Sequence, residues 1–475
     1  MADNGMLFTN NCVTTSVCWA SRSTLATGTY TAVHKHTFPF QDADFETEHW
    51  ENTLFPLMKN KDYFTGLFGK WHKLEIEDEV EAAFDRYKFY YGHHWEERDG
   101  KMRHVTELNK SDSLQYLKQW NRQRLRKMKK NEGYQPFFLT TSFFATHARD
   151  GAFPSYQPTN ETRSSVYPDD LVIPKAKTAT EEHWNDLPGF LRHDRNEGRT
   201  RWKQRFDPSN FQTSIKDMYA MATEVDEAVG AIIQQARNMG VYHETVFIFT
   251  TDNGNMHGEH GLAEKWYPFE ESLRVPLVIQ DPRMPKERRG TTSEAWTLNV
   301  DLAPTILAVA DIPPSDFMQG RDIADLYLNK DKKHKGLSNT EMIKATDWRT
   351  EWFYEFNLGK EDDASDHPWK RFIDASFALV TDEWKYVVWP QHDNYEQLFH
   401  RSVDPFDEWD LLNKILRPDS VKRRLTQNDS ESDGGKEEDI NGPFLDTVQT
   451  TQEIYNQMKE RYNQMKKKAQ SGERI

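Results

Sequence analysis

The chain has 475 residues, which is long enough for one large domain and a smaller one. Its formal net charge of −15 argues against non-specific binding to nucleic acid and against attachment to an anionic membrane surface. No apolar run approaches the length of a membrane span, and the N-terminus lacks the basic region and apolar stretch of a signal peptide. The sequence therefore predicts no nucleic-acid partner and no membrane span.

Short apolar runs predict four buried strands, at residues 64–68, 137–143, 246–251 and 275–279. Between two of them, apolar residues recur at helical spacing from 213 to 239, and a glycine follows as a natural helix stop. This alternation predicts an α/β fold with a mainly parallel sheet flanked by helices.

Chemically active side chains follow three of these strands. Lys70 and His72 follow the first, His147 follows the second, and Asp252 with Asn253 follow the third. Ligands of such sheets bind beyond the carboxyl ends of the strands. We therefore expect these five side chains to lie at one edge of the sheet.

The remaining segments predict further parts of the molecule. Residues 150–212 are polar, contain proline and show little periodicity, which predicts a long surface excursion that shapes the substrate site. Three apolar runs after residue 350 predict antiparallel strands of a smaller unit, followed by an acidic Ser/Gly/Asp-rich stretch and a polar helix. The predicted organisation is a main domain at 1–333, a C-terminal antiparallel α+β subdomain at 334–417, a mobile acidic linker at 418–443 and a helical segment at 444–475.

The stretch from Cys18 to Gly28, Cys-Trp-Ala-Ser-Arg-Ser-Thr-Leu-Ala-Thr-Gly, is the most informative in the chain. It resembles the sulfatase signature, a Cys-x-(Pro/Ala)-x-Arg core closed by Leu-x-Thr-Gly. The resemblance implies that a formylglycine-generating enzyme oxidises Cys18 to formylglycine, whose hydrate is the nucleophile. Cys12, the other cysteine, then has no partner for a disulfide. The alternative is a small apolar cysteine packed at a helix start.

The chemistry of a sulfate ester gives a reason for the residues of this signature. The ester is an anion, so cations must neutralise its oxygens before an activated nucleophile can approach. A gem-diol formed from Cys18 could attack sulfur with one oxygen and keep the other to expel sulfate. Arg22, one helical turn further on, would hold the hydrate by charge-assisted hydrogen bonds.

Two more motifs resemble those that carry catalytic histidines in this family. Gly69-Lys70-Trp71-His72 implies that Lys70 holds a sulfate oxygen and that His72 acts on the formylglycine hydroxyl in the elimination step. His147 matches the histidine that binds sulfate and protonates the leaving alcohol, although Thr146 stands where the family has proline.

A metal motif and a second lysine follow. The segment from Phe249 to Gly254 resembles the family's metal motif, in which Asp252 and Asn253 would give hard oxygen ligands to Ca²⁺ or Mg²⁺, with the converted Cys18 as a third ligand. Lys265 matches the second lysine that binds sulfate.

The resemblance covers roughly residues 5 to 415 in order. The Gly-Glu-His-Gly form at residues 258–261 is most similar to the branch that holds carbohydrate, iduronate-type and choline-type sulfatases. The family belongs to the alkaline phosphatase superfamily. The resemblance therefore implies an alkaline-phosphatase-like main domain and a C-terminal four-stranded subdomain.

One departure from the family concerns its first strand. Sulfatases open with a central strand that ends in a metal-binding Asp-Asp pair, a few dozen residues before the signature cysteine, whereas 17 residues precede Cys18 here. The loss of this strand predicts an opened sheet with unpaired backbone groups, and it leaves Asp252 and Asn253 as weak metal ligands. Asp42 and Asp44 could substitute, but a solvated loop is the favoured interpretation of both.

Two explanations of this departure compete. Either the sequence is part of a longer protein, which we favour because it also explains the lack of a signal peptide, or it is a sulfatase relative without catalysis. Family members are mostly secreted, lysosomal or periplasmic, so the resemblance implies a secreted or lysosomal location that the chain itself does not indicate.

Three functions stay open at this point. The first hypothesis is a sulfuric ester hydrolase that acts on a sulfated carbohydrate or a related small ester. The second is a non-catalytic binder of sulfated glycans that uses the same cationic pocket. The third is a phosphodiester or phosphonate hydrolase, because related enzymes share the fold and the formylglycine, and the fold alone does not separate them.

Overall fold

The structure is a computed structural model that describes residues 1–36, 50–71, 82–90, 92–193, 195–357, 373–413 and 448–474. The predicted catalytic His72 lies outside the described residues, as do Asp42, Asp44 and the acidic linker. No helix in the described ranges is long and apolar enough to cross a membrane.

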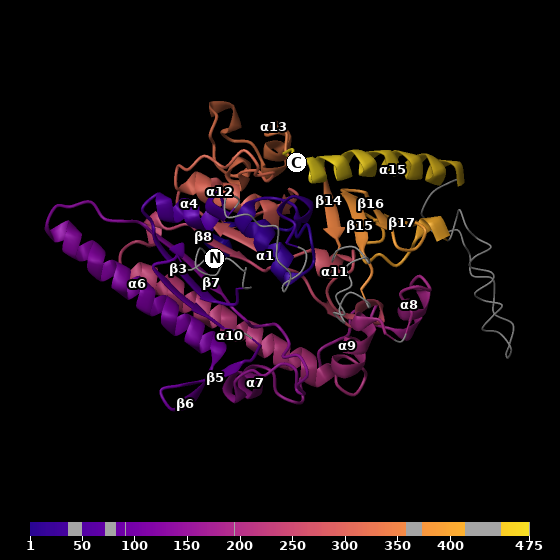
Figure 1. The fold of residues 1–475 in the computed structure, drawn as a ribbon, viewed down its shortest axis with the longest axis horizontal. Coiled ribbons are helices and arrows are strands. Elements are labelled where there is room, and N and C mark those ends of the chain that lie inside the picture. Colours follow the sequence, from indigo (N-terminus) through magenta and orange to yellow (C-terminus); the bar gives the residue numbers. More distant parts are fainter. Residues whose placement is uncertain are drawn as a thin grey trace.

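Two separate sheets form the centre of the main body, with helices on both sides (Figure 1). The first sheet is parallel, with the order β4 (Arg86–Phe89), β3 (Phe64–Gly69), β7 (Phe137–Ser142). The second has the order β12 (Thr291–Ser293), β1 (Met6–Phe8), β11 (Leu277–Gln280), β8 (Phe247–Thr250). In this second sheet β1 and β12 are parallel, whereas β11 runs antiparallel to both of its neighbours.

The four strands expected from apolar runs are therefore present as β3, β7, β8 and β11. Helices lie on both sides of these sheets, which accounts for the large apolar side chains in each strand, although Thr140, Thr141 and Ser142 make the end of β7 polar. In β3, Phe64 and Phe68 pack against α6 (Val105–Lys129), whereas Leu67 lies on the opposite face against α4 (Leu54–Asn60) and α12 (Leu302–Val309). The predicted helix is α10 (Phe211–Asn238), which lies beside α6 (Figure 1).

The segment at 150–212 contains three short helices, α7 (Asn160–Val166), α8 (Glu181–Asp186) and α9 (Glu197–Arg205). A Thr or Asn side chain caps the start of each and accepts a hydrogen bond from the third helical residue's N–H. α9 packs so closely on the segment after the metal motif that a Cβ at Gly198 would lie 2.7 Å from the hydroxyl of Tyr267. The excursion therefore folds back onto the main body.

The C-terminal sheet is antiparallel, with the order β14 (Glu351–Phe356), β15 (Ser376–Thr381), β16 (Trp384–Trp389), β17 (Tyr395–His400). The long helix α15 (Val448–Ser471) covers it (Figure 1) and buries Met458, Tyr462 and Met465 in the same core. The four strands and the helix agree with the predicted subdomain and C-terminal helix. The domain boundaries proposed from the sequence stay predictions.

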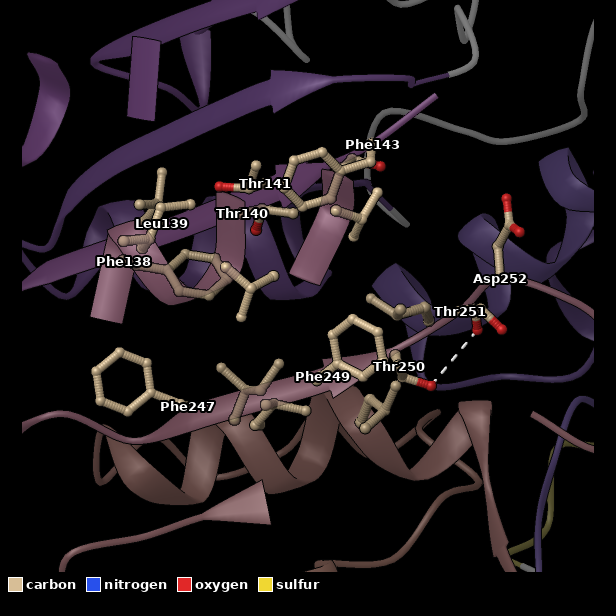
Figure 2. A pocket seen from close by; sticks show the side chains of 18 of the residues that line it. Phe138, Leu139, Thr140, Thr141, Phe143, Phe247, Phe249, Thr250, Thr251 and Asp252 are labelled. Atoms are coloured by element: carbon tan, nitrogen blue, oxygen red, sulfur yellow. Dashed lines mark hydrogen bonds between the residues drawn. The ribbon is translucent and has the colours of Figure 1, made fainter. Parts of the chain in front are cut away.

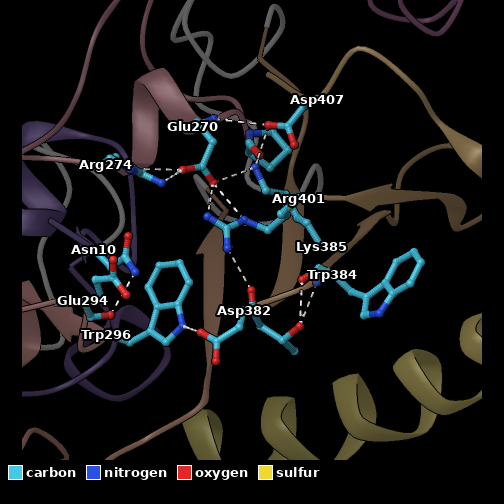
Figure 3. Close-up of polar contacts among 12 residues, drawn as sticks. Asn10, Glu270, Arg274, Glu294, Trp296, Asp382, Trp384, Lys385, Arg401 and Asp407 are labelled. Carbon is cyan, nitrogen blue, oxygen red and sulfur yellow. Dashed lines mark hydrogen bonds and ion pairs between the residues drawn. The ribbon is translucent and has the colours of Figure 1, made fainter. Parts of the chain in front are cut away.

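A buried network of charges joins this sheet to the main body (Figure 3). The Lys385 ammonium on β16 lies 2.6 Å from a carboxylate oxygen of Asp407 and 3.2 Å from one of Glu270, at the start of α11 (Glu270–Leu273). Arg401 contacts the same Glu270 oxygen at 3.1 Å. The lysine side chain is fully buried, so it is compensated entirely by these carboxylates.

Shorter elements complete the described chain. The remaining strands and α-helices are β2 (Asn11–Cys12), β5 (Trp95–Arg98), β6 (Lys101–His104), β9 (Met256–His257), β10 (Ala263–Glu264), β13 (Thr297–Leu298), α1 (Cys18–Thr27), α2 (Thr31–His34) and α13 (Asn339–Ala345). The 3₁₀ helices are η1 (Ala2–Asn4), η2 (Tyr242–Glu244), η3 (Glu259–Gly261), η4 (Lys286–Arg288), η5 (Asn299–Asp301), η6 (Ile323–Leu326) and η7 (Lys332–His334).

Candidate active site

Most of the side chains predicted for the site line one cavity of about 620 Å³ between β7 and β8. Those present at its wall are Arg22, Lys70, His147, Asp252, Asn253 and Lys265. The described residues that follow the three strands therefore meet at one cavity, but it lies between two separate sheets and not at one edge of a single sheet. Cys18 lies next to them, on the helix that carries Arg22.

Helix α1 presents the signature at its N-terminal end. Cys18 is its first residue and is 4% exposed. The N–H groups of a first helical turn lack intrahelical partners, so this end of the helix favours anions. Gly28 ends the helix with φ of 67°, and its N–H donates to the carbonyl of Thr24 at 2.9 Å. The helix is therefore one closed unit from Cys18 to Gly28, with Arg22 one turn from the cysteine.

Arg22 ties three strand ends together. Its Nε and Nη2 lie 2.8 and 2.7 Å from one carboxylate oxygen of Asp252, after β8. Its Nη1 donates to the carbonyl of Lys70, after β3, at 2.5 Å, and to the hydroxyl of Ser142, at the end of β7. The role of Ser142 was not predicted, although the residue opens the motif that contains His147.

Around Asp252, the cavity wall carries three cations, Arg22, Lys70 and Lys265. Another carboxylate in the wall, that of Glu264, is paired with Arg205. Burial lowers the pKa of Lys70, while Cys18 and Asp252 oppose this shift. Burial alone would raise the pKa of Asp252, but the three cations together hold it well below its ordinary value. The carboxylate is therefore ionised, and the remaining positive charge suits an anionic ligand.

His147 is held as a neutral base. Its Nδ1 lies 2.6 Å from the carbonyl of Ala148, which can only accept, so the proton is on Nδ1 and the lone pair is on Nε2. Burial, followed by the charges of Lys70 and Lys265, places the pKa of His147 well below 6.5. The imidazole gains a proton only when an anion offsets the two lysines.

Lys265 sits in a strained segment. Its neighbours Glu264 and Trp266 have φ of 73° and 87°, in the left-handed region that is unfavourable for residues with a Cβ. Such a conformation persists only when surrounding contacts hold it. Here Arg205 of α9 pairs with Glu264, whose carboxylate lies 3.8 Å from the Lys265 ammonium. The backbone N–H of Trp266 donates to the carbonyl of Ser16 at 3.2 Å.

This arrangement makes Arg205 and Glu264 positioning residues for Lys265. Arg205 is almost fully buried and also contacts Asp150 at 3.0 Å, so two carboxylates compensate its charge. Glu264 is the sequence neighbour of a predicted residue and could have been suspected. Arg205 lies in the segment without periodicity, and no sequence signal pointed to it.

The described residues do not complete a site for a divalent metal. The side-chain oxygen of Asn253 is buried without a hydrogen-bond partner, which suits a ligand, but the Asp252 carboxylate is paired with Arg22. Ca²⁺ takes six to eight oxygen ligands and Mg²⁺ about six. No group of three or more His, Cys, Asp or Glu side chains that could hold a metal occurs in the described part of the chain. The predicted set of Asp252, Asn253 and Cys18 is too small by itself.

Two edge strands border this cavity. β7 is the last strand of the first sheet and β8 the last strand of the second, and they face each other across the cavity (Figure 2). All of their residues are partly exposed, although both strands are rich in phenylalanine. The gap explains why the two strands are less buried than their composition predicts.

Known proteins are similar over almost the whole chain. Residues 1–312 match the family model described as sulfatase, and residues 258–431 match that of the N-sulphoglucosamine sulphohydrolase C-terminal region. An N-acetylglucosamine-6-O-sulfatase of Bacteroides thetaiotaomicron is 20% identical, over 87% of this chain and 77% of that protein. An ulvan-active sulfatase of Formosa agariphila is 25% identical, over 70% of this chain and 60% of that protein.

Solved structures share the fold. A protein bound to its substrate D-glucosamine-2-N,6-O-disulfate superimposes with a TM-score of 0.63 at 18% identity, covering 96% of this chain and 92% of that one. A phosphonate monoester hydrolase of Agrobacterium radiobacter gives 0.61 at 19% identity, covering 90% and 88%. These likenesses confirm the predicted alkaline-phosphatase-like α/β fold. Because the first family model covers well over half of the sequence, the chain belongs to the sulfatase family.

Proposed function

We propose that this protein is a sulfuric ester hydrolase that removes sulfate from a sulfated carbohydrate, with a formylglycine formed from Cys18. The observation that carries the proposal is the cationic cavity of Arg22, Lys70 and Lys265 beside Cys18 at a helix N-terminus. The named relatives act on sulfated sugars or polysaccharides, which supports the substrate class. Formylglycine, when present, supplies the nucleophilic oxygen.

The two lysines bind the sulfate group from two sides. Lys70 and Lys265 are each 5% exposed, so their charges act in a partly desolvated cavity, where they stabilise an anion more strongly than in water. Arg22 is anchored by Asp252, Lys70 and Ser142, so its guanidinium is held rigidly beside Cys18. The charge is thus arranged before the substrate enters.

His147 is proposed to protonate the leaving alcohol. The free imidazole is neutral because burial and the two lysines lower its pKa. A sulfate bound between these lysines offsets their charge and raises the proton affinity of Nε2. The histidine therefore becomes an acid when substrate is bound, which is when the leaving alcohol needs a proton. The role of His72 and the choice of Ca²⁺ or Mg²⁺ stay predictions from the resemblance.

One alternative has a specific observation in its favour. Because the described residues hold too few oxygen ligands for a metal, the same cavity could bind sulfated glycans without hydrolysing them. Such a binder would be indifferent to chelators and to the oxidation state of Cys18. The other alternative, a phosphodiester or phosphonate hydrolase with the same fold and formylglycine, is tested by comparing substrates.

The test compares Cys18→Ala with Cys12→Ala. Cys12 is equally buried, but it lies on β2 away from the cavity wall, and burial raises the pKa of its thiol to about 12. We expect Cys18→Ala to abolish release of sulfate from an aryl sulfate and from sulfated glucosamine, with an unchanged melting temperature. Cys12→Ala should keep its turnover. Full sulfate release by Cys18→Ala would contradict the proposal.

Two further measurements separate the alternatives. Mass spectrometry of the Cys18 peptide, with and without a co-expressed formylglycine-generating enzyme, reports whether the aldehyde forms. Turnover of an aryl phosphodiester that exceeds turnover of the aryl sulfate would favour the phosphodiesterase. Binding of a sulfated glycan that is unaffected by a chelator, without any turnover, would favour the binder.

A further inference from the structure

The second half of α6 carries an exposed stripe of positive charge. Four exposed cations recur there at spacings of four, four and three residues: Lys118, Arg122, Arg126 and Lys129. Side chains at these spacings lie on one face of a helix, and at a rise of about 1.5 Å per residue this basic stripe is about 16 Å long. The opposite face of α6 buries Leu117 and Trp120 against β3.

We propose that the basic stripe is a second binding site, which holds a sulfated polysaccharide chain outside the cavity. The first turns of α6 adjoin the active site, because the side-chain amide of Asn109 donates to the carbonyl of Ser142 at 3.5 Å. Lys118 lies about 14 Å further along the helix. A chain that reaches from the cavity to the stripe therefore contains several sugars. Its use as a substrate rests on the proposed function, whereas its binding does not.

The charge of the stripe is not neutralised by the protein. Residues 113–131 contain seven Lys or Arg and no Asp or Glu, although the whole chain has a net charge of −15. Two carboxylates earlier in α6 already have partners, since Asp112 lies 2.7 Å from Arg98 and Glu107 pairs with Lys110. No cation of the stripe forms an ion pair with a described residue. The stripe is therefore available to an external anion.

The stability of the helix does not account for this arrangement. Cations in the last turn stabilise the carbonyl end of the helix dipole, but the effect is confined to that turn, and Lys118 and Arg122 lie before it. Like charges four residues apart repel each other and destabilise a helix, and the stripe contains two such pairs in succession. A polyanion that lies along the stripe would remove this repulsion.

A further cation widens the stripe on one side. Arg86, which is exposed on β4, donates from its Nε to the side-chain oxygen of Gln119 at 3.1 Å. This hydrogen bond holds its guanidinium beside α6. Guanidinium and ammonium groups form strong, charge-assisted hydrogen bonds with anionic oxygens, so sulfate groups suit this surface.

The uncharged residues on this face favour a polysaccharide over other polyanions. Gln115 and Gln119 lie among the cations, and their amides can form hydrogen bonds with sugar hydroxyls. The helix positions between the cations carry no aromatic residue, whereas sites for single-stranded nucleic acid use aromatic rings to stack the bases. The exposed large apolar residues of α6 are Leu125 and Met128, which are too few for insertion into a membrane.

Charge reversal on the stripe tests the location of binding. In Arg122→Glu/Arg126→Glu, each new carboxylate lies four residues from a lysine, Lys118 or Lys130, so the helix should be at least as stable as in wild type. We expect the affinity for heparin to fall at least tenfold. The slope of log K against log salt concentration should become shallower by about two, because two cations no longer contact the chain. The melting temperature, measured in parallel, should not fall.

The matched control is Lys467→Glu/Lys468→Glu. It makes the same change in net charge at two exposed positions of α15, which lies far from α6 (Figure 1). We expect it to weaken heparin binding less than twofold. Equal losses in the two double variants would show that overall charge determines binding, and wild-type affinity in Arg122→Glu/Arg126→Glu would place heparin elsewhere. Either result overturns the proposal.

Other polyanions decide which partner the stripe fits. Heparin, duplex DNA and phosphatidylserine vesicles are compared at one salt concentration, because the affinity of every polyanion depends on salt. We expect heparin to bind at least tenfold more tightly than the other two. DNA or vesicles bound as tightly as heparin, with the same loss in Arg122→Glu/Arg126→Glu, would assign the stripe to nucleic acid or to a membrane and overturn the proposal.

Steady-state kinetics separate the stripe from the proposed catalysis. Arg122→Glu/Arg126→Glu should raise KM for sulfate release from heparin at least fivefold without changing kcat, and it should leave turnover of an aryl sulfate unchanged. An unchanged KM for heparin would refute a role of the stripe in holding the substrate. If the wild-type protein releases no sulfate, the proposed function fails, but heparin binding by Cys18→Ala still tests the stripe.

Discussion

Two regions of the molecule, the C-terminal sheet and the strands beside the cavity, differ in how completely their residues are buried. Every residue of β15 and β16 in the C-terminal sheet is buried, because each strand has two neighbours and α15 covers the face. Every residue of β7 and β8 is only partly buried, although both strands carry phenylalanine and other large apolar side chains. The edge strand β14 is also buried from Trp352 to Phe356, so the low burial of β7 and β8 comes from the cavity beside them and not from an edge position alone.

The buried charges of the two ends differ in the same way. Lys385 in the C-terminal region has two carboxylates within 3.2 Å, which neutralise its charge and join the sheet to the main body. Lys70 and Lys265 share the cavity wall with Arg22 and Asp252, and the Glu264 carboxylate near Lys265 is paired with Arg205. The buried charge of Lys385 therefore stabilises the fold, whereas those of Lys70 and Lys265 are placed to bind an anion.

The largest expected effect on stability is at Lys385, which joins the C-terminal sheet to the main body. Lys385→Met leaves Glu270 and Asp407 buried without their cation, which should destabilise the protein by about 3–5 kcal/mol. Lys330→Met is the control, because Lys330 forms half-exposed pairs with Asp322 and Asp325 and its loss should cost less than about 1 kcal/mol. Urea unfolding measures both. Equal losses of free energy of unfolding in the two variants would contradict the expectation that the buried ion pairs of Lys385 contribute more than the half-exposed pairs of Lys330.

A pair of leucine truncations tests the burial comparison directly. Leu379 on β15 is fully buried, so Leu379→Ala should cost about 2–5 kcal/mol. Leu139 on β7 is partly exposed to the cavity, so Leu139→Ala should cost no more than about 1.5 kcal/mol. A Leu139→Ala cost as large as that of Leu379→Ala would show that the cavity is closed in solution.

The smallest expected effect is a pH dependence in the closed region. Glu355 on β14 accepts a hydrogen bond from the N–H of Ala32 at 2.8 Å, and burial raises its pKa from 4.5 to about 7. The folded carboxyl holds its proton more tightly than the unfolded one. This difference contributes at most about 3 kcal/mol to the free energy of unfolding. The contribution is fully present below about pH 4.5 and is lost as the pH rises through about 7.

Glu355→Gln should remove this contribution, because the amide does not ionise. The measurement is the free energy of unfolding at about pH 5 and pH 8, where the variant should lose less stability than wild type between the two values. Glu132→Gln, at an exposed position, is the control and should match wild type. A variant with the wild-type slope would show that another group titrates in this range.

Local patterns in the sequence predicted much of the site. Arg22 follows Cys18 by one helical turn, and Lys70, His147 and Asp252 each follow an apolar run, so their positions at strand ends were predictable. Their meeting across two separate sheets was not. Thr180 and Asn196 are residues typical of helix N-caps, and they mark the starts of α8 and α9. These helices have few apolar residues, so no helical periodicity predicted them.

The sequence by itself determined the family, the order of the strands along the chain and the identity of most cavity side chains, because these depend on motifs and on local periodicity. Only the tertiary structure decided that Arg205 and Glu264 hold Lys265 and that Arg22 joins Ser142 to Asp252. It also decided that β7 and β8 face each other across the cavity, with no other strand of the described residues between them. Such contacts join segments far apart in the chain, and no local pattern records which of them meet.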